Sequence, residues 1–224
     1  MRRLRDSGRV LNPSTSLRDA AQGSGLSVPF SGRDLLDADD GPQTFTVNCH
    51  LKILTQPTID LEDMIAEMQV IFDTADVRMP IGSRQNLTGS DFTDLLDLNV
   101  GQCAGNTTTE QNDLFDERDD AGKDDLVIYF VRSTVPAFNG CGSHPDDQPG
   151  CVVAQGASLW TLAHEVGHVL DLPHISGEQD QNGNCVTPNF TRLMTGCSTN
   201  NITSTPTLSS GEIDTVQGSD YAQE

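Results

Sequence analysis

The sequence predicts a mixed α/β domain in which helices pack on a twisted sheet, and three stretches carry this prediction. Residues 45–53 alternate between apolar and polar side chains, which is the pattern of a half-buried strand. Residues 61–72 place apolar side chains on one stripe at helical spacing. Residues 126–131 form an uninterrupted apolar run, as expected of a central strand that is buried on both faces.

The first half of the chain adds fewer elements. Residues 1–43 are rich in Arg, Ser, Asp and Gly without a sustained period, so we interpret them as a flexible leader or the remnant of a pro-segment. Residues 44–224 are assigned to one folded domain. Thr58 or Asp60 is the predicted cap of the first helix, and residues 77–79 form a short strand that Pro80 ends.

The second half is easier to interpret after residue 126. Residues 91–98 are expected to form a short helix within an otherwise polar loop. A Gly- and Pro-rich loop over residues 141–151 leads to Val152 and Val153, the predicted edge strand. Ser158 is the expected cap of a helix that runs through Leu170. A turn over residues 193–196 and a weak helix over residues 210–216 follow.

Composition excludes several classes of function. The chain has 33 acidic and 13 basic side chains among 224 residues, for a net charge of −20. Such a protein is repelled by nucleic acids and by anionic membranes, which are polyanions. No apolar run approaches the roughly 20 residues that a spanning helix needs. Met1–Arg9 is basic, but no apolar segment follows it, so we expect this chain to carry no signal peptide.

The six cysteines indicate disulfides. None lies in a Cys-x-x-Cys pair, and several lie in loops rich in Gly, Pro and Asn, which favours three disulfides in an oxidising compartment over six buried thiols in the cytosol. Near neighbours in flexible loops meet most often. We therefore predict the pairs Cys185–Cys197 and Cys141–Cys151, which leaves Cys49–Cys103.

The stretch from His164 to His174 carries the chemistry. His164 and His168 are four residues apart, so on a helix both side chains project from one face. Glu165 lies beside them, and residues 171–173 can turn the chain so that His174 returns as a third ligand. Three histidines leave the fourth position of a tetrahedral zinc ion open, as in catalytic sites. With this chain's own composition, the pattern is expected by chance on the order of 10⁻⁴ times.

This stretch resembles the extended zinc-binding motif of the metzincin metallopeptidases, His-Glu-x-x-His-x-x-Gly-x-x-His. The resemblance implies that His164, His168 and His174 bind zinc, that Glu165 is the catalytic general base, and that Met194 lies in a Met-containing turn beneath the metal. It also implies a metzincin-like catalytic domain with an edge strand over the cleft, a backing helix and an active-site helix. The disulfide-bearing linker between His174 and Met194 resembles the pappalysin-like bacterial branch.

Two positions depart from the family pattern. Asp171 stands where the family usually has Gly, at a turn expected to need a positive φ; Asp tolerates that region better than most residues. Gly196 stands two residues after Met194, where several branches carry a Tyr, so a phenolic group from that position is not expected.

The resemblance implies a secreted zinc endopeptidase in which Glu165 assists attack by a zinc-bound water. A protein or peptide substrate and a monomer are expected. Two alternatives remain open at this point: a non-catalytic, zinc-stabilised binding or adhesion module, and a zinc amidase that acts on small substrates. The presence of Glu165 argues against the first, because such modules usually lose the base.

A second metal is a further interpretation. Asp180, Asn182 and Asn184 alternate, with Gly183 available for a sharp turn, and their oxygens could hold Ca²⁺. The segment lacks the bidentate Glu that completes an EF-hand loop, so a plain polar loop is the other interpretation.

Overall fold

The computed structural model describes residues 45–223, so the predicted flexible leader over residues 1–43 lies outside the described residues. Its main element is a five-stranded sheet in the order β4-β2-β6-β9-β8. The first four of these strands are parallel, and β8 is antiparallel to β9. The strands are β2 (Cys49–Ile53), β4 (Ile81–Asn86), β6 (Leu126–Val131), β8 (Gly140–Cys141) and β9 (Gly150–Ala154).

Two small parallel pairs flank the sheet. β1 (Phe45–Thr46) pairs with β3 (Val77–Arg78), and β5 (Asp97–Asn99) pairs with β7 (Ser133–Val135). Strand β3 confirms the short strand predicted over residues 77–79, whereas β4, β5 and β7 were not predicted. These strands are short or, like β4, carry few apolar side chains, so the period of two is hard to detect in them.

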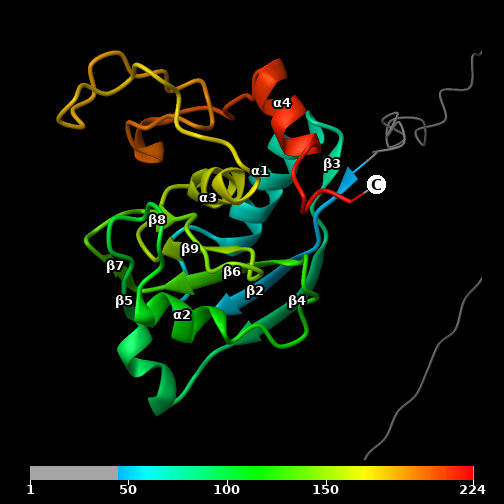
Figure 1. The fold of residues 1–224 in the computed structure, drawn as a ribbon, viewed down its shortest axis with the longest axis vertical. Helices are drawn as coiled ribbons and strands as arrows, with labels where there is room; N and C mark the ends of the chain where they lie inside the picture. The colour runs from blue at the N-terminus through cyan, green and yellow to red at the C-terminus, as the bar shows by residue number, and fades with distance from the viewer. Residues whose placement is uncertain (1–44, 224) are drawn as a thin grey trace, which may run out of the picture. The chain divides into compact units, whose positions relative to one another are not determined.

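The domain has three layers. Helices α1 (Leu61–Asp73) and α3 (Thr161–Val169) pack together on one face of the sheet, and α2 (Thr109–Phe115) covers the other (Figure 1). Each face has its own apolar cluster, because successive strand residues point to opposite sides. In the part of the chain that the structure describes, no helix is both long and apolar enough to span a membrane.

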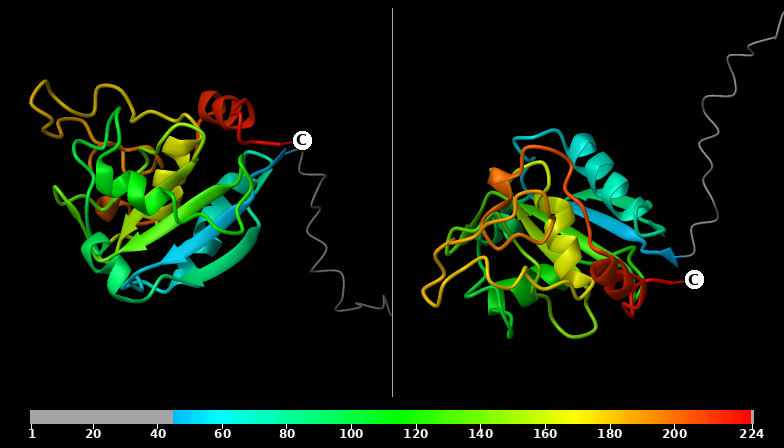
Figure 2. Two further views of the ribbon diagram at one scale, coloured as in Figure 1. Left: turned by 60° about the horizontal axis from the view of Figure 1, so that its bottom comes forward. Right: turned by 90° about the horizontal axis from the view of Figure 1, so that it is seen from above.

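The long connection between α3 and α4 (Ser210–Gln217) returns to α3 through the short 3-10 helix η2 (Thr199–Asn201), as Figure 2 shows from two sides. The hydroxyls of Thr161 at the start of α3 and Thr199 in η2 lie 2.8 Å apart, and both residues are buried. Helix α4 confirms the predicted helix over residues 210–216, and Ser209 and Glu212 form its capping box.

The central strand is confirmed, since all six residues of β6 are fully buried. The strand predicted over residues 45–53 is divided into β1 and β2, which belong to different sheets, and β2 is more buried than predicted. Its apolar residues face α1 and α3, as expected, but His50 and Lys52 on the opposite face are also buried. His50 Nε2 lies 3.2 Å from Asp125, and Lys52 donates to the carbonyl oxygen of Asp119. The loop before β6 therefore covers these two polar side chains, which the alternating pattern alone could not reveal.

The helices follow the sequence with two corrections. Asp60 caps α1, as predicted, and its carboxylate accepts from the backbone of Glu62. Residues 91–98 do not form one helix. The 3-10 helix η1 (Ser90–Leu95) covers the first part of this stretch, and strand β5 begins at Asp97. Helix α2 lies in the stretch that the sequence analysis left as a loop, although Thr108 gives it a capping box with Gln111.

The predicted edge strand is wrong. Val152 and Val153 lie in β9, which β6 and β8 flank on its two sides, and β8 is the edge strand. The two residues of β8 come from a segment whose Gly and Pro content indicated a loop.

Two of the three predicted disulfides are also wrong. The structure pairs Cys103 with Cys141, and leaves Cys49 and Cys151 as buried free thiols. Cys141 lies opposite Val152 in the antiparallel pair, so it shares a face of the sheet with Val152, while Cys151 points to the other face. Nearness in sequence therefore did not bring Cys141 and Cys151 together. The predicted pair Cys185–Cys197 is present.

Candidate metal centre

Helix α3 carries two of the candidate ligands and Glu165. It begins at Thr161, two residues later than a cap at Ser158 predicts, and Ser158 does not cap it. The backbone N–H of Ser158 instead donates to the hydroxyl of Thr161, at 3.0 Å. Every residue of the helix except His168 is buried, because α3 lies between α1 and the sheet edge.

A left-handed turn at Asp171 ends α3. The N–H of Leu172 donates to the carbonyl oxygen of Gly167, and the N–H of Asp171 donates to that of His168. These two bonds form a Schellman motif, whose reversing residue is usually Gly. Asp171 occupies that position with φ of 67°, which confirms the positive φ expected from the sequence. The turn leads the chain back along α3 and brings His174 to the two helical histidines.

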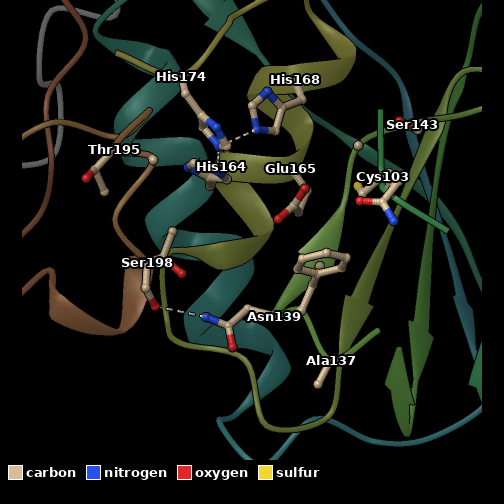
Figure 3. Close-up of a pocket in the computed structure, with 16 residues that line it drawn as sticks. Cys103, Ala137, Asn139, Ser143, His164, Glu165, His168, His174, Thr195 and Ser198 are labelled. Atoms are coloured by element: carbon tan, nitrogen blue, oxygen red, sulfur yellow. Dashed lines mark hydrogen bonds between the residues drawn. The ribbon is translucent and has the colours of Figure 1, made fainter. Parts of the chain in front are cut away.

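The three imidazoles converge on one point (Figure 3). His174 Nε2 lies 3.2 Å from His164 Nε2 and 3.1 Å from His168 Nε2. Ligand nitrogens 2.0–2.1 Å from a tetrahedral zinc ion are about 3.3 Å apart along each edge of the tetrahedron. Among the described residues, this is the group of His, Cys, Asp and Glu side chains whose atoms could share a metal ion. The spacing of the three nitrogens therefore fits zinc.

Hydrogen bonds prepare two of these nitrogens as ligands. The Nδ1–H of His164 donates to the carbonyl oxygen of Leu193, and that of His168 donates to Leu172, both at 2.7 Å. Because a carbonyl oxygen can only accept, Nδ1 carries the proton and Nε2 keeps its lone pair. Burial lowers the pKa of His164 to about 3 and that of His168 to about 4. Both rings are therefore neutral at pH 7, as metal binding requires.

Glu165 lies on the cleft side of α3 beside the histidines (Figure 3). It is only 6% exposed, and burial raises the pKa of its carboxyl group to about 8. Its carboxylate could hold a water molecule beside the metal without being a ligand, because the residue next to His164 projects from a different part of the helix.

The edge strand β8 lies unusually close to Glu165 and His168. A Cβ atom added at Gly140 would lie 2.6 Å from Glu165 Cγ, and one added at Gly142 would lie 2.4 Å from His168 Cβ. Both contacts are shorter than any side chain tolerates, so only Gly fits at these positions. Of the two, Gly142 lies in the stretch over residues 141–151 that predicted a Gly- and Pro-rich loop.

Met194 packs against Gly167 of the helix that carries His164 and His168. It is fully buried, and its Sδ atom would lie 2.7 Å from a Cβ atom added at Gly167. The preceding residue, Leu193, accepts the bond from His164, and Met194 itself accepts from the backbone of Ile175. The turn at Met194 thus contacts the helix that carries His164 and the segment that carries His174.

Glu178 is a site residue that the sequence analysis missed. Its side chain is buried, with 2% exposure, and accepts three hydrogen bonds. The donors are the N–H of Asn189 at 2.6 Å, the hydroxyl of Thr195 at 3.0 Å and the N–H of Gly196 at 2.7 Å. Glu178 therefore ties the segment after His174 to the turn after Met194. No local pattern in the sequence marks it, since its partners are 11 to 18 residues away.

The calcium interpretation is not supported. The Asp180 carboxylate accepts from the backbone N–H groups of Asn182 and Asn184 and from the Asn184 side chain. These bonds lower the pKa of Asp180 and close a local turn. Asn184 points its amide nitrogen, not its oxygen, at the carboxylate, so the three residues do not present a shared set of oxygen ligands. The segment is a polar turn.

The histidines and Glu165 line a cleft of about 620 Å³. One wall comes from the segment before and within β8, including Phe138, and from Cys103 of the loop that the disulfide ties to β8. The opposite wall comes from the segment after Met194, including Thr195 and Ser198. Asn139 donates from the first wall to Ser198 of the second, at 3.4 Å (Figure 3).

This arrangement is the fold of a class of solved metalloproteinases. Metalloproteinase-II from Bacteroides fragilis aligns with a TM-score of 0.52 and 16% identity, over 78% of this chain and 53% of that one. Archaemetzincin from Methanopyrus kandleri aligns with a TM-score of 0.50 and 12% identity, over 82% of this chain and 98% of that one. The chain thus spans about half the length of the Bacteroides protein. No family model and no curated protein matches the sequence.

Proposed function

We propose that this protein is a zinc-dependent endopeptidase of the metzincin type. One observation carries the proposal: the Nε2 atoms of three histidines meet beside a buried glutamate in the wall of an open cleft. The fold shared with solved metalloproteinases supports it. Peptide bonds are the proposed substrate, because the cleft is open to solvent and several segments of the chain line it.

In this proposal His164, His168 and His174 hold the zinc ion. When bound, zinc supplies a Lewis acid that polarises the scissile carbonyl and makes a water molecule more acidic. Glu165 accepts a proton from the attacking water on its carboxylate and then donates it to the nitrogen of the leaving amine as the C–N bond breaks. Electrostatic attraction to a neighbouring cation favours the charged form of Glu165, which opposes the effect of burial.

Three features support the metzincin type. Asp171 makes the left-handed turn that the motif requires, Met194 packs beneath Gly167 of α3, and an edge strand runs along the cleft. Within that group, the linker that Cys185–Cys197 closes supports the pappalysin-like bacterial branch.

We further propose that residues 44–224 form the catalytic domain, that residues 1–43 are a leader or pro-segment remnant, and that the protein acts outside the cell as a monomer. The two disulfides support an oxidising compartment.

Zinc content and proteolysis of the purified protein test the proposal. We expect one zinc ion per chain, cleavage of an unfolded protein substrate, and loss of cleavage after chelation with recovery on adding zinc. Glu165→Gln should keep the zinc and the fold, because Glu165 is not a ligand, while turnover falls about 10²- to 10⁴-fold. Undiminished turnover by zinc-loaded Glu165→Gln protein would refute the role of Glu165, and full activity without metal would refute the proposal as a whole.

A further inference from the structure

Phe138 is an apolar side chain that the fold leaves exposed inside the cleft. Four large apolar side chains are exposed in the described part of the chain: Val70, Val135, Phe138 and Val186. Of these, Phe138 alone lines the cleft, and it is 42% exposed. Exposed aromatic rings in concave sites commonly serve to bind a ligand.

The side chains that line the cleft around Phe138 are uncharged, and some of them are apolar. Ala137 and the sulfur-bearing Cys103 line the same wall. No Lys or Arg lines the cleft within the described residues, and Glu165 is the one acid that does. The opposite wall is polar but uncharged, since it comes from residues such as Thr195 and Ser198. A charged substrate side chain would find no partner against Phe138, whereas an apolar one would remove the ring from water.

The loop that carries Phe138 is fixed before any substrate arrives. The backbone N–H of Phe138 donates to the hydroxyl of buried Thr134 at 2.7 Å, and that hydroxyl donates to the carbonyl oxygen of Pro136 at 2.8 Å. On the other side, the carbonyl oxygen of Asn139 accepts from the backbone of Ala154, at 2.9 Å. A preformed subsite loses little conformational entropy on binding, so its contacts contribute fully to affinity.

Phe138 is also near the reacting groups. Gly140, two residues later, is in direct contact with Glu165, and two residues of chain span at most about 7 Å. Because an extended substrate also advances about 3.3 Å per residue, the side chain that meets Phe138 belongs to a residue within about two positions of the cleaved bond.

We propose that Phe138, with Ala137 and Cys103, forms an apolar subsite that selects substrates with an aromatic or large aliphatic side chain within about two positions of the cleaved bond. This inference rests on the proposed peptidase function.

The test uses the zinc-loaded protein and a set of internally quenched peptides. The peptides differ only at the two positions on either side of the cleaved bond, each occupied in turn by Phe, Leu, Ala, Ser, Asp or Lys. For wild type we expect kcat/KM to favour Phe and Leu over Ala and Asp at one of these positions by about 10-fold or more. Phe138→Ala should abolish that preference mainly through KM, with little change for the Ala peptide.

Val135→Ala is the matched control. Val135 is exposed in the same segment, at 51%, but does not line the cleft, so its variant should keep the wild-type preference. Phe138→Leu, which stays apolar, should keep a reduced preference. No preference in wild type, or equal changes in Phe138→Ala and Val135→Ala, would overturn the proposed subsite.

A binding measurement separates this inference from the proposed function. Fluorescence anisotropy with labelled peptides is measured on zinc-loaded Glu165→Gln protein, with and without Phe138→Ala. Binding of Phe peptides that depends on Phe138, in a protein whose wild type cleaves none of them, would refute the peptidase and keep the subsite. Cleavage without any dependence on Phe138 would keep the peptidase function and refute the subsite. The absence of both binding and cleavage would refute the peptidase function and the subsite.

Discussion

At the scale of single residues, the conformation of Asp171 determines where His174 lies. A non-Gly residue in the left-handed region costs about 1–2 kcal/mol, and Asp is among the residues that tolerate it. Asp171→Gly should therefore be neutral or stabilising. A β-branched Asp171→Val should shift the turn, displace His174 and weaken zinc retention. Zinc release to a chromogenic chelator measures this, and an unchanged release rate for Asp171→Val would show that the turn does not position His174.

Glu165 gives the metal-free protein a predictable pH dependence. Burial raises its pKa from 4.5 to about 8, so between these values the unfolded chain releases a proton that the folded protein keeps. The free energy of unfolding therefore falls, through this group, as pH rises from about 4.5 to about 8. Glu165→Gln removes the effect.

Chemical denaturation of the chelated proteins measures this dependence. We expect the stability of Glu165→Gln relative to wild type to increase between pH 5 and pH 8. A difference that stays constant over this range would mean that the carboxyl group of Glu165 is not desolvated.

Glu178 should matter for both stability and metal retention. Glu178→Ala leaves the buried donors of Thr195 and Gly196 without a partner, at about 1–3 kcal/mol for each group. For Glu178→Ala we expect a lower free energy of unfolding in urea and faster zinc release. Glu178→Gln keeps one acceptor oxygen, so both of its values should lie between those of Glu178→Ala and wild type. If Glu178→Ala unfolds like wild type, the three hydrogen bonds do not hold the turn at Met194.

At the scale of elements, β8 and α3 can approach closely because Gly140 and Gly142 lack side chains. The added methyl group of Gly142→Ala should push the chain after β8 away from His168. The free energy of unfolding should then fall by about 1–3 kcal/mol. Gly211→Ala in α4 is the control, since nothing lies within 4 Å of the added Cβ atom, and Ala favours a helix. Thermal unfolding and zinc content of the two variants compare them. Equal behaviour would indicate that β8 can move away at no cost.

The sequence predicted those elements whose pattern is local. Each of these patterns lies within about a dozen neighbouring residues, so the sequence alone shows it. They are the apolar run of β6, the apolar stripe of α1 and the spacing of His164, His168 and His174. Contacts between distant segments were not predictable in this way. The disulfide between Cys103 and Cys141 joins residues 38 positions apart. The hydrogen bond from Gly196 to Glu178 likewise joins two segments that are distant in sequence. The burial of His50 and Lys52 depends on a loop about 70 residues further along the chain.

At the scale of the whole described domain, the free thiols lie within the main apolar core. Cys49 and Cys151 are fully buried on the face of the sheet that α1 and α3 cover. Burial raises the pKa of Cys49 to about 12 and that of Cys151 well above its usual range. Neither thiol should form a reactive thiolate at pH 8.

Thiol labelling measures this directly. The native protein should incorporate no iodoacetamide under non-reducing conditions, and the unfolded protein should incorporate two equivalents, at Cys49 and Cys151. A peptide that joins Cys49 to Cys103, or Cys141 to Cys151, would contradict the observed pairing.

The hydrogen bond from His168 to Leu172 has a consequence for how the centre assembles. Leu172 belongs to the turn at Asp171, the same turn that delivers His174. Until that turn forms, nothing holds the ring of His168 in the tautomer that leaves Nε2 free, and His174 is not in place. One turn therefore orients one candidate ligand and delivers another, so a change in its backbone should disturb two of the three histidines together.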